Sequence, residues 1–157
     1  MPAMDIVDSN LIPGIFLLFL MIIIALIDYQ QQIIPNKLLL VGTIVGTVLN
    51  LAVGKLSLLE MIIGLASGGT VLLVIAVISK GGMGGGDVKL AAMLGIYLGW
   101  EHTLQTIFWA ALLAALTGLI LMLAGKANRT TAIPFGPFLA ISTFGLFLGQ
   151  LLINNWN

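Results

Sequence analysis

Six long apolar runs dominate this sequence and restrict how the chain can fold. They cover approximately residues 11–27, 38–53, 58–78, 88–98, 103–123 and 133–153. Most of them approach the roughly 20 residues that an α-helix needs to cross the hydrocarbon core of a bilayer. Backbone groups in lipid must satisfy their own hydrogen bonds, so the runs predict helices. The expected fold is an all-α polytopic membrane protein, a bundle of about six transmembrane helices in a single domain, residues 1–157.

The composition agrees with a chain that lies mostly in the lipid bilayer. Hydrophobic residues make up 60% of it and charged residues only 8%, whereas about a quarter of a soluble domain is charged. The formal net charge is zero and gives no indication of a nucleic-acid partner. The chain has no Cys and only His102 as histidine. These counts exclude a cysteine nucleophile, and we expect no metal site.

The basic residues predict the orientation of the helices. The first, third and fifth loops hold five of the six basic residues: Lys37, Lys80, Lys89, Lys126 and Arg129. The other loops and the termini hold only Lys55, and the N-terminal residues lack the basic start of a cleavable signal peptide. Cytoplasmic loops are enriched in Lys and Arg. We therefore expect a retained first run, both termini outside, and a multi-pass protein of the inner (cytoplasmic) membrane.

A glycine-rich loop, residues 79–89, joins the third and fourth runs and carries a carboxylate near its end. Gly84, Gly85 and Gly86 directly precede Asp87. Glycine disfavours helix, so we expect non-helical backbone here, sheltered inside the protein, followed by a short fourth helix. A carboxylate beside apolar sequence is costly in a membrane and indicates a function.

Asp28 is the other carboxylate at the end of an apolar run, in a chain with only four Asp and two Glu. The predicted topology places Asp28 and Asp87 at the same cytoplasmic depth. Two carboxylates a few ångströms apart cannot both ionise cheaply, so they share one proton. The ionised member can take a proton from water while the protonated member donates to a peptide carbonyl. The pair therefore predicts aspartic-protease chemistry, active towards the cytoplasm, without a metal or cofactor.

Simpler roles are open for the same residues. Asp87 could cap the fourth helix, and Asp28 could be a solvated charge just past the first. Lys89 could neutralise Asp87, orient a substrate, or only determine the topology. Pro134 and Gly136 open the sixth run, either as a helix entry or as an active-site wall that an extended peptide can approach.

Small residues recur at helical spacing inside three of the runs. The Gly-x-x-x-Gly pattern lets two helices approach closely, and we expect all three pairs to pack within a compact bundle. The pairs are Gly42 with Gly46, Gly64 with Gly68, and Gly145 with Gly149.

Three segments together resemble the type IV prepilin peptidases. Residues 84–90, Gly-Gly-Gly-Asp-Val-Lys-Leu, are similar to that family's G-x-G-D-x-K-L signature. Asp28, followed by Pro35 and Asn36, is similar to the first aspartate motif, although some members have Asp at the position of Asn36. Residues 133–138, Ile-Pro-Phe-Gly-Pro-Phe, are similar to the family's final segment.

The resemblance implies a membrane aspartic endopeptidase of the G-x-G-D class. Such enzymes remove the basic leader of type IV prepilins and pseudopilins, precursors with an apolar helix, at the cytoplasmic membrane face. Asp28 and Asp87 match the catalytic aspartates. The resemblance and the sequence around them imply substrate-binding or supporting roles for five more residues: Gly84, Gly86, Lys89, Pro134 and Gly136.

Longer bacterial members of that family have an N-terminal cytoplasmic region with paired CxxC motifs. This cysteine-free chain instead resembles the short, peptidase-only members, or the catalytic half of a longer enzyme. The methylation that many members perform with S-adenosylmethionine is therefore not assigned to this chain.

Two other functions are open at this point. A presenilin-like intramembrane protease shares the G-x-G-D element. Its Tyr-Asp pair is absent, because Asp28 here precedes Tyr29, and its Pro-Ala-Leu segment is also absent. A proton- or cation-coupled carrier could use the same two carboxylates as ion sites, although no inverted repeat is evident.

Overall fold

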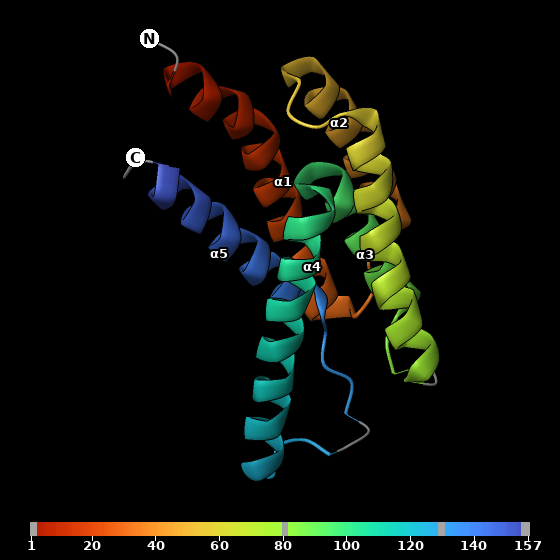
Figure 1. The fold of residues 1–157 in the computed structure, drawn as a ribbon. Helices are drawn as coiled ribbons and strands as arrows, with labels where there is room; N and C mark the ends of the chain where they lie inside the picture. The colour runs from red at the N-terminus through yellow and green to blue at the C-terminus, as the bar shows by residue number, and fades with distance from the viewer. Residues whose placement is uncertain (1–2, 80–81, 129–130, 155–157) are drawn as a thin grey trace.

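The computed structural model describes residues 3–79, 82–128 and 131–154, and these form five α-helices without strands (Figure 1). Lys80 and Arg129, which contributed to the predicted orientation, lie outside the described residues. The helices are α1 (Ala3–Gln31), α2 (Asn36–Val53), α3 (Leu58–Ile78), α4 (Gly85–Leu123) and α5 (Gly136–Asn154). Helices α1 to α4 are long and apolar enough to cross a membrane, whereas the apolar part of α5 is shorter.

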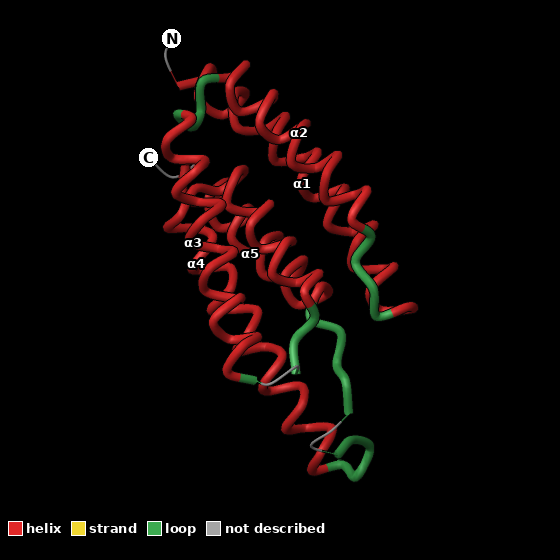
Figure 2. The backbone as a smooth tube through the Cα atoms, turned by 90° about the vertical axis from the view of Figure 1, so that its right-hand side faces the viewer, coloured by secondary structure: helices red, strands yellow, loops and turns green. Residues whose placement is uncertain are grey.

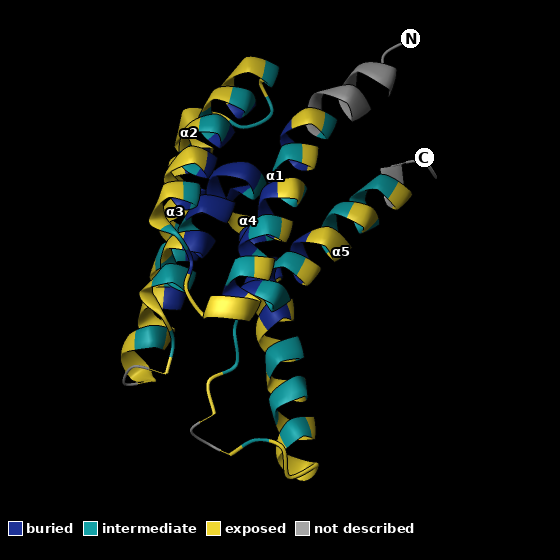
Figure 3. Ribbon diagram, turned by 180° about the vertical axis from the view of Figure 1, so that it is seen from behind, coloured by how far each residue is buried: buried dark blue, intermediate teal, exposed yellow. Residues whose placement is uncertain are grey.

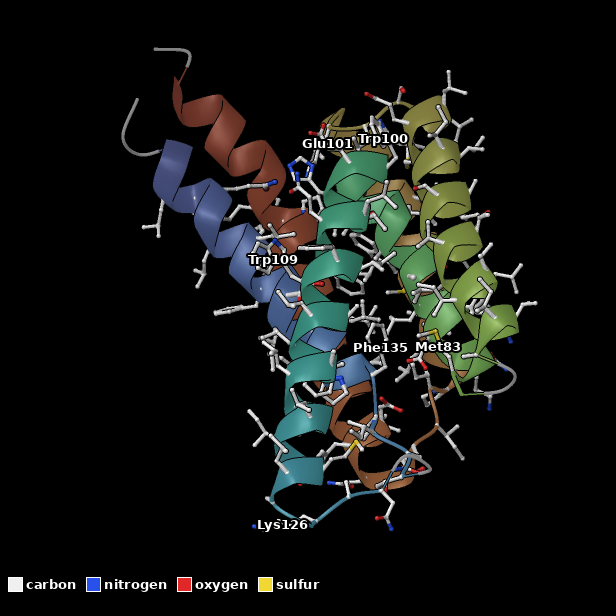
Figure 4. All side chains as sticks on the ribbon, turned by 60° about the horizontal axis from the view of Figure 1, so that its bottom comes forward. Met83, Trp100, Glu101, Trp109, Lys126 and Phe135 are labelled. Atoms are coloured by element: carbon white, nitrogen blue, oxygen red, sulfur yellow. The ribbon has the colours of Figure 1, made fainter. Side chains whose placement is uncertain are left out.

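Among the described residues, five helices are assigned where six were expected, because the fourth and fifth apolar runs form two helical arms that are joined without a loop and share one label, α4. Helix α4 continues from Gly85 to Leu123 and is interrupted only at Gly99, where φ is 72° and ψ is 175°. Only glycine adopts this backbone conformation without strain. The interruption divides α4 into a first arm, residues 85–98, and a second arm, residues 100–123. Figure 4 shows that the second arm returns, with Trp100 and Glu101 at one end of the molecule and Lys126 at the other.

The first arm of α4 forms the centre of the core. Figure 3 shows the buried residues gathered there, between α1, α2 and α3. A helix that is apolar on every side is stable only when surrounded by other elements. Its buried side chains come from all around the helix: Leu90, Ala91, Met93, Leu94, Ile96 and Tyr97. The arm that begins with Asp87 is therefore held on several sides by the rest of the bundle.

Glycines let this central arm approach its neighbours closely, as two of the three Gly-x-x-x-Gly pairs predicted. The side chains of Met93 and Tyr97 occupy the space where Cβ atoms would lie at Gly42 and Gly46. The Tyr97 hydroxyl also donates a hydrogen bond of 2.6 Å to the Gly42 carbonyl oxygen. On the other side of the arm, Gly64 and Gly68 lie directly against its backbone.

The third Gly-x-x-x-Gly pair behaves differently, and the expectation that it packs within the bundle is wrong. No heavy atom in the described part of the chain lies within 4 Å of a Cβ built at Gly145 or Gly149. Both residues are on α5, which diverges from the centre of the bundle in Figure 1. A small-residue pair therefore identifies a surface where a helix can approach, but not whether this chain supplies that helix.

The loops between the helices lie at two ends of the molecule. Figure 2 shows the loops after α1, α3 and α4 towards one end and the α2–α3 loop at the other. The α2–α3 loop is closed by Gly54, with φ of 65°, and by a capping box in which Ser57 and Glu60 hydrogen-bond to each other's backbone N–H. Glu60 and Glu101 are exposed at this second end. The two aspartates lie towards the first end.

Candidate active site

Asp28 lies inside the last turn of α1, which ends at Gln31. The side chain is only 5% exposed, so it is not the solvated charge past the helix end that the simpler interpretation expected. Its Oδ2 atom accepts a hydrogen bond of 2.8 Å from the backbone N–H of Gly136, the first residue of α5. N–H groups in the first turn of a helix have no intrahelical partner. The α5 N-terminus therefore holds the Asp28 carboxylate.

Asp87 lies in the first turn of α4. The helix begins at Gly85, with Gly84 as its N-cap, so Gly85 and Gly86 are helical and the expected non-helical stretch is shorter than predicted. Asp87 is half-buried, and its Oδ1 atom is buried without a hydrogen-bond partner among the described residues. The positive end of a helix dipole favours a carboxylate in the first turn. Each aspartate thus lies at the N-terminus of a helix, Asp28 at that of α5 and Asp87 at that of α4. Among the described residues, Asp87 Oδ1 is available to another group.

The two aspartates line the same cleft, of about 300 Å³. Its walls come from three parts of the chain: the end of α1, the α3–α4 loop with the start of α4, and the segment before α5. Figure 4 shows Met83 and Phe135 from the last two parts near each other, far from Trp100. Besides the aspartates, the lining residues are Gln32, Gly82, Met83, Gly84, Ala132, Ile133, Pro134 and Phe135.

The segment before α5 combines both roles that its prolines and glycine suggested. Pro134 lines the cleft, and Gly136 begins the helix and donates to Asp28. The Gln32 side-chain amide donates a hydrogen bond of 3.3 Å to the Ala132 carbonyl oxygen, which joins this wall to the end of α1. Gln32 has a φ of 54°, a conformation that ends α1 at Gln31, within one turn of Asp28.

Gly136 is expected to be irreplaceable for activity. A Cβ at this position would lie 2.7 Å from Asp28 Oδ2 and 3.2 Å from Asp28 Cγ, so Gly136→Ala must move the carboxylate or the start of α5. Because displacement of a reacting group by about 1 Å can cost a hundredfold in rate, we expect kcat for peptide cleavage to fall by about that factor. Gly145→Ala on the same helix, where a Cβ meets open space, is the matched control. Equal activity of the two variants would contradict this geometry.

Lys89 and Gly86 contact the α1–α2 connection rather than the cleft. Lys89 Nζ donates a hydrogen bond of 2.9 Å to Asn36 Oδ1, not to Asp87. A Cβ at Gly86 would lie 3.0 Å from Ile34 Cβ, so the two backbones are close there. The sequence interpretation assigned no contact to Ile34, Gln32 or Met83, and it gave Asn36 only as part of the first aspartate motif. An isolated Asn or Gln in a polar loop gives no signal for a contact that depends on packing.

The cleft offers two carboxylates, backbone groups and apolar walls. Within the described parts of the chain, no group of three or more His, Asp or Glu residues is placed to hold a metal ion. Two carboxylates at one water-accessible cleft can activate water and protonate a carbonyl oxygen. The arrangement is therefore suited to hydrolysis by general acid–base chemistry.

Comparison with known families gives a match over most of the chain. The type IV leader peptidase family matches residues 15–119, a range that includes Asp28 and Asp87. The chain belongs to the type IV leader peptidase family. This membership favours a peptidase over the carrier that could have used the same carboxylates.

Curated relatives support the family assignment. A prepilin leader peptidase/N-methyltransferase of Bacillus subtilis (strain 168) is 32% identical over 142 residues, which cover 90% of this chain and 57% of that protein. Proteins of the same name are 35% identical in Pseudomonas putida, over 76% of this chain and 43% of that protein, and 32% identical in Aeromonas hydrophila, over 96% and 56%. The chain thus spans about half the length of these relatives. No solved structure matches it.

Proposed function

We propose that this chain is a membrane-embedded aspartic endopeptidase that removes the leader of type IV prepilins or pseudopilins. The observation that carries the proposal is the shared cleft of Asp28 and Asp87 in a member of the type IV leader peptidase family. The similarity to prepilin leader peptidases over most of the chain supports this class of substrate. The name of those relatives includes N-methyltransferase, but the proposed activity here is peptide cleavage alone.

The proposed mechanism uses the aspartates as a pair. The ionised carboxylate takes a proton from a water molecule, and the oxygen of that water attacks the scissile carbonyl carbon. The protonated carboxylate donates its proton to the carbonyl oxygen. Collapse of the tetrahedral intermediate breaks the C–N bond, and the leaving amine takes a proton from the pair. Because coupled carboxylates titrate as a unit, neither role is assigned to one residue.

The proposed orientation places the cleft towards the cytoplasm. Lys37 and Lys89 lie in the first turns of α2 and α4, and Lys126 follows the end of α4, all towards the end of the molecule that holds the cleft, whereas Lys55 is in the α2–α3 loop at the other end. An excess of Lys and Arg is typical of cytoplasmic loops. A precursor would then be cut at the inner face of the cytoplasmic membrane, where its basic leader is exposed.

Cleavage of a prepilin by the purified chain tests this function directly. The protein, reconstituted in detergent or liposomes without S-adenosylmethionine, is incubated with precursors, and mass spectrometry identifies the leader and the new N-terminus. We expect one cut between the basic leader and the apolar segment. A chain that folds, as judged by circular dichroism, but cuts no prepilin or pseudopilin would contradict the proposal.

An apolar groove beside the cleft is the proposed location of the precursor's apolar helix. The groove, of about 400 Å³, is lined by α1 residues from Leu18 to Tyr29 and by the start of α5. Its length along α1, 11 residues at 1.5 Å each, is about 16 Å, roughly half of the hydrocarbon core. Tyr29 and Pro137 at one end of the groove directly follow Asp28 and Gly136, which are hydrogen-bonded to each other. A precursor helix bound in the groove would thus have the polar segment next to its end at the cleft.

Filling the groove should block the membrane-inserted precursor selectively. In Ala140→Trp, a large side chain on α5 occupies the groove, and we expect the catalytic efficiency for a full precursor to fall about tenfold, because a displaced substrate helix loses its contacts. Cleavage of a short leader-junction peptide without the apolar helix should be unchanged. Ala66→Trp, on an exposed face of α3, is the matched control. If Ala140→Trp cuts the full precursor at the wild-type rate, the groove is occupied by lipid instead.

A further inference from the structure

The two aspartates belong to segments that are far apart in the sequence and meet near the α1–α2 connection. Asp28 lies at the end of α1, and Asn36 is the first residue of α2 after a short turn. Asp87 and Lys89 both lie in the first turns of α4. The Lys89 Nζ to Asn36 Oδ1 hydrogen bond of 2.9 Å joins the two segments directly.

A second contact joins the same two segments from inside the protein. Ile34 is only 8% exposed and packs in the core, whereas most of its neighbours in the turn are exposed. A Cβ added at Gly86 would lie 3.0 Å from Ile34 Cβ, which is tighter than ordinary van der Waals contact. The turn that follows Asp28 is therefore seated on the helix turn that carries Asp87.

The position of Lys89 suits its hydrogen bond to Asn36 and not a direct contact with the reacting groups. It is exposed, it does not line the cleft that holds both aspartates, and its ammonium group donates to Asn36. We propose that Asn36 and Lys89 are positioning residues, which hold the α1–α2 turn against α4 so that Asp28 and Asp87 face the same cleft. This inference rests on the proposed peptidase function. It assigns to Lys89 a role different from neutralising Asp87 or binding the substrate.

The consequence of losing the link is a change in rate rather than a loss of fold. An exposed hydrogen bond contributes little to the stability of a bundle with a large apolar core. Small displacements of reacting groups, in contrast, have large effects on the chemical step. A positioning role thus predicts a reduced kcat, an unchanged KM and an unchanged melting temperature.

Kinetics of four variants and one control separate positioning from substrate binding. We expect Asn36→Ala and Lys89→Met each to lower kcat about tenfold with KM nearly constant, because the aspartates are displaced. The double variant should be no slower than the worse single variant, since both remove the same interaction. Asn36→Asp should keep wild-type kcat, because a carboxylate accepts the same hydrogen bond. Lys126→Met, which removes the same charge from the exposed α4–α5 loop, is the matched control and should be unaffected.

Other kinetic outcomes would overturn the inference. If Lys89→Met raises KM, or lowers kcat further in the Asn36→Ala background, Lys89 contacts the substrate. If both single variants keep wild-type kcat, the hydrogen bond does not position the aspartates.

A distance measurement tests the link without any activity. The chain has no Cys, so cysteines introduced at the exposed positions Gln31 and Gly85 can carry the only two spin labels. We expect a narrow distance distribution by electron spin resonance in liposomes for the otherwise unchanged chain and with Asn36→Asp, and a broader or shifted one with Asn36→Ala or Lys89→Met. Identical distributions in all four would overturn the link. A chain that shows the expected distributions but cuts no prepilin would contradict the peptidase function instead.

Discussion

We expect Asp87→Asn to lower the rate of leader cleavage about 10²- to 10⁴-fold, the range typical of a lost general acid–base group, and Asp28→Asn to have the same effect. An amide cannot take a proton from water or donate one as a carboxylic acid does. The fold should survive both changes. In the described part of the chain Asp87 Oδ1 has no partner to lose, and an amide oxygen at position 28 can still accept from the Gly136 N–H. The measurements are kcat for prepilin cleavage and the melting temperature of each variant.

Glu101→Gln provides the control for these two substitutions. It removes one negative charge at the exposed end of the molecule away from the cleft, so cleavage should be unaffected. If Asp28→Asn or Asp87→Asn cut a prepilin at the wild-type rate, the two-aspartate mechanism would be wrong, whatever the family membership. If only one of them were inactive, the reaction would depend on a single carboxylate and not on a pair.

Replacing Gly95 by Ala destabilises the chain by about 3 kcal/mol, the upper part of the range for overpacked cores. Gly64 on α3 and Gly95 on the central arm of α4 face each other, and a Cβ built on either overlaps the backbone of the other. A side chain could move aside, but here both helix backbones would have to separate along their length. The melting temperature or the denaturant midpoint in detergent measures the effect.

The matched control for this prediction is Gly149→Ala. A Cβ there meets no atom in the described part of the chain, and alanine favours helix over glycine by about 1 kcal/mol. We therefore expect unchanged or slightly higher stability. If Gly95→Ala were as stable as Gly149→Ala, the close approach of α3 to the central arm would be wrong.

The fold could be predicted from the sequence as far as hydrophobicity determines it. Long apolar runs require helices in lipid, so helix type and the approximate bounds of α2 and α3 were accessible, whereas α1 begins eight residues before the predicted run. The direct junction between the two arms of α4 was not accessible, because Trp100, Glu101 and His102 interrupt the apolar pattern and suggested a loop. One glycine with positive φ is enough to reverse the direction there, and a hydrophobicity pattern does not distinguish such a point from a loop. The start of α4 was missed for a similar reason, since glycine weakens a helix without preventing its first turn.

The candidate site was partly accessible. Asp28 and Asp87 could be identified because carboxylates are so few in this chain, and the basic loops predicted that both lie at one end. Their catalytic role stays a prediction until the variants are measured. The link from Lys89 to Asn36 could not be foreseen, because it joins residues 53 positions apart and depends on how closely Ile34 seats on Gly86. The packing of α5 was mispredicted, since Gly145 and Gly149 carry the same pattern as the buried pairs.

The reversal at Gly99 separates two arms of one helix that each connect to a wall of the cleft. Its first arm delivers Asp87, and its second arm leads into the segment that ends at Gly136. Gly99 lies 12 residues from Asp87, about 18 Å along the first arm, and its φ of 72° cannot be adopted comfortably by residues with a Cβ. We therefore expect a substitution at Gly99 to change the angle between the two arms of α4 and to misalign the cleft, although Gly99 itself does not line it.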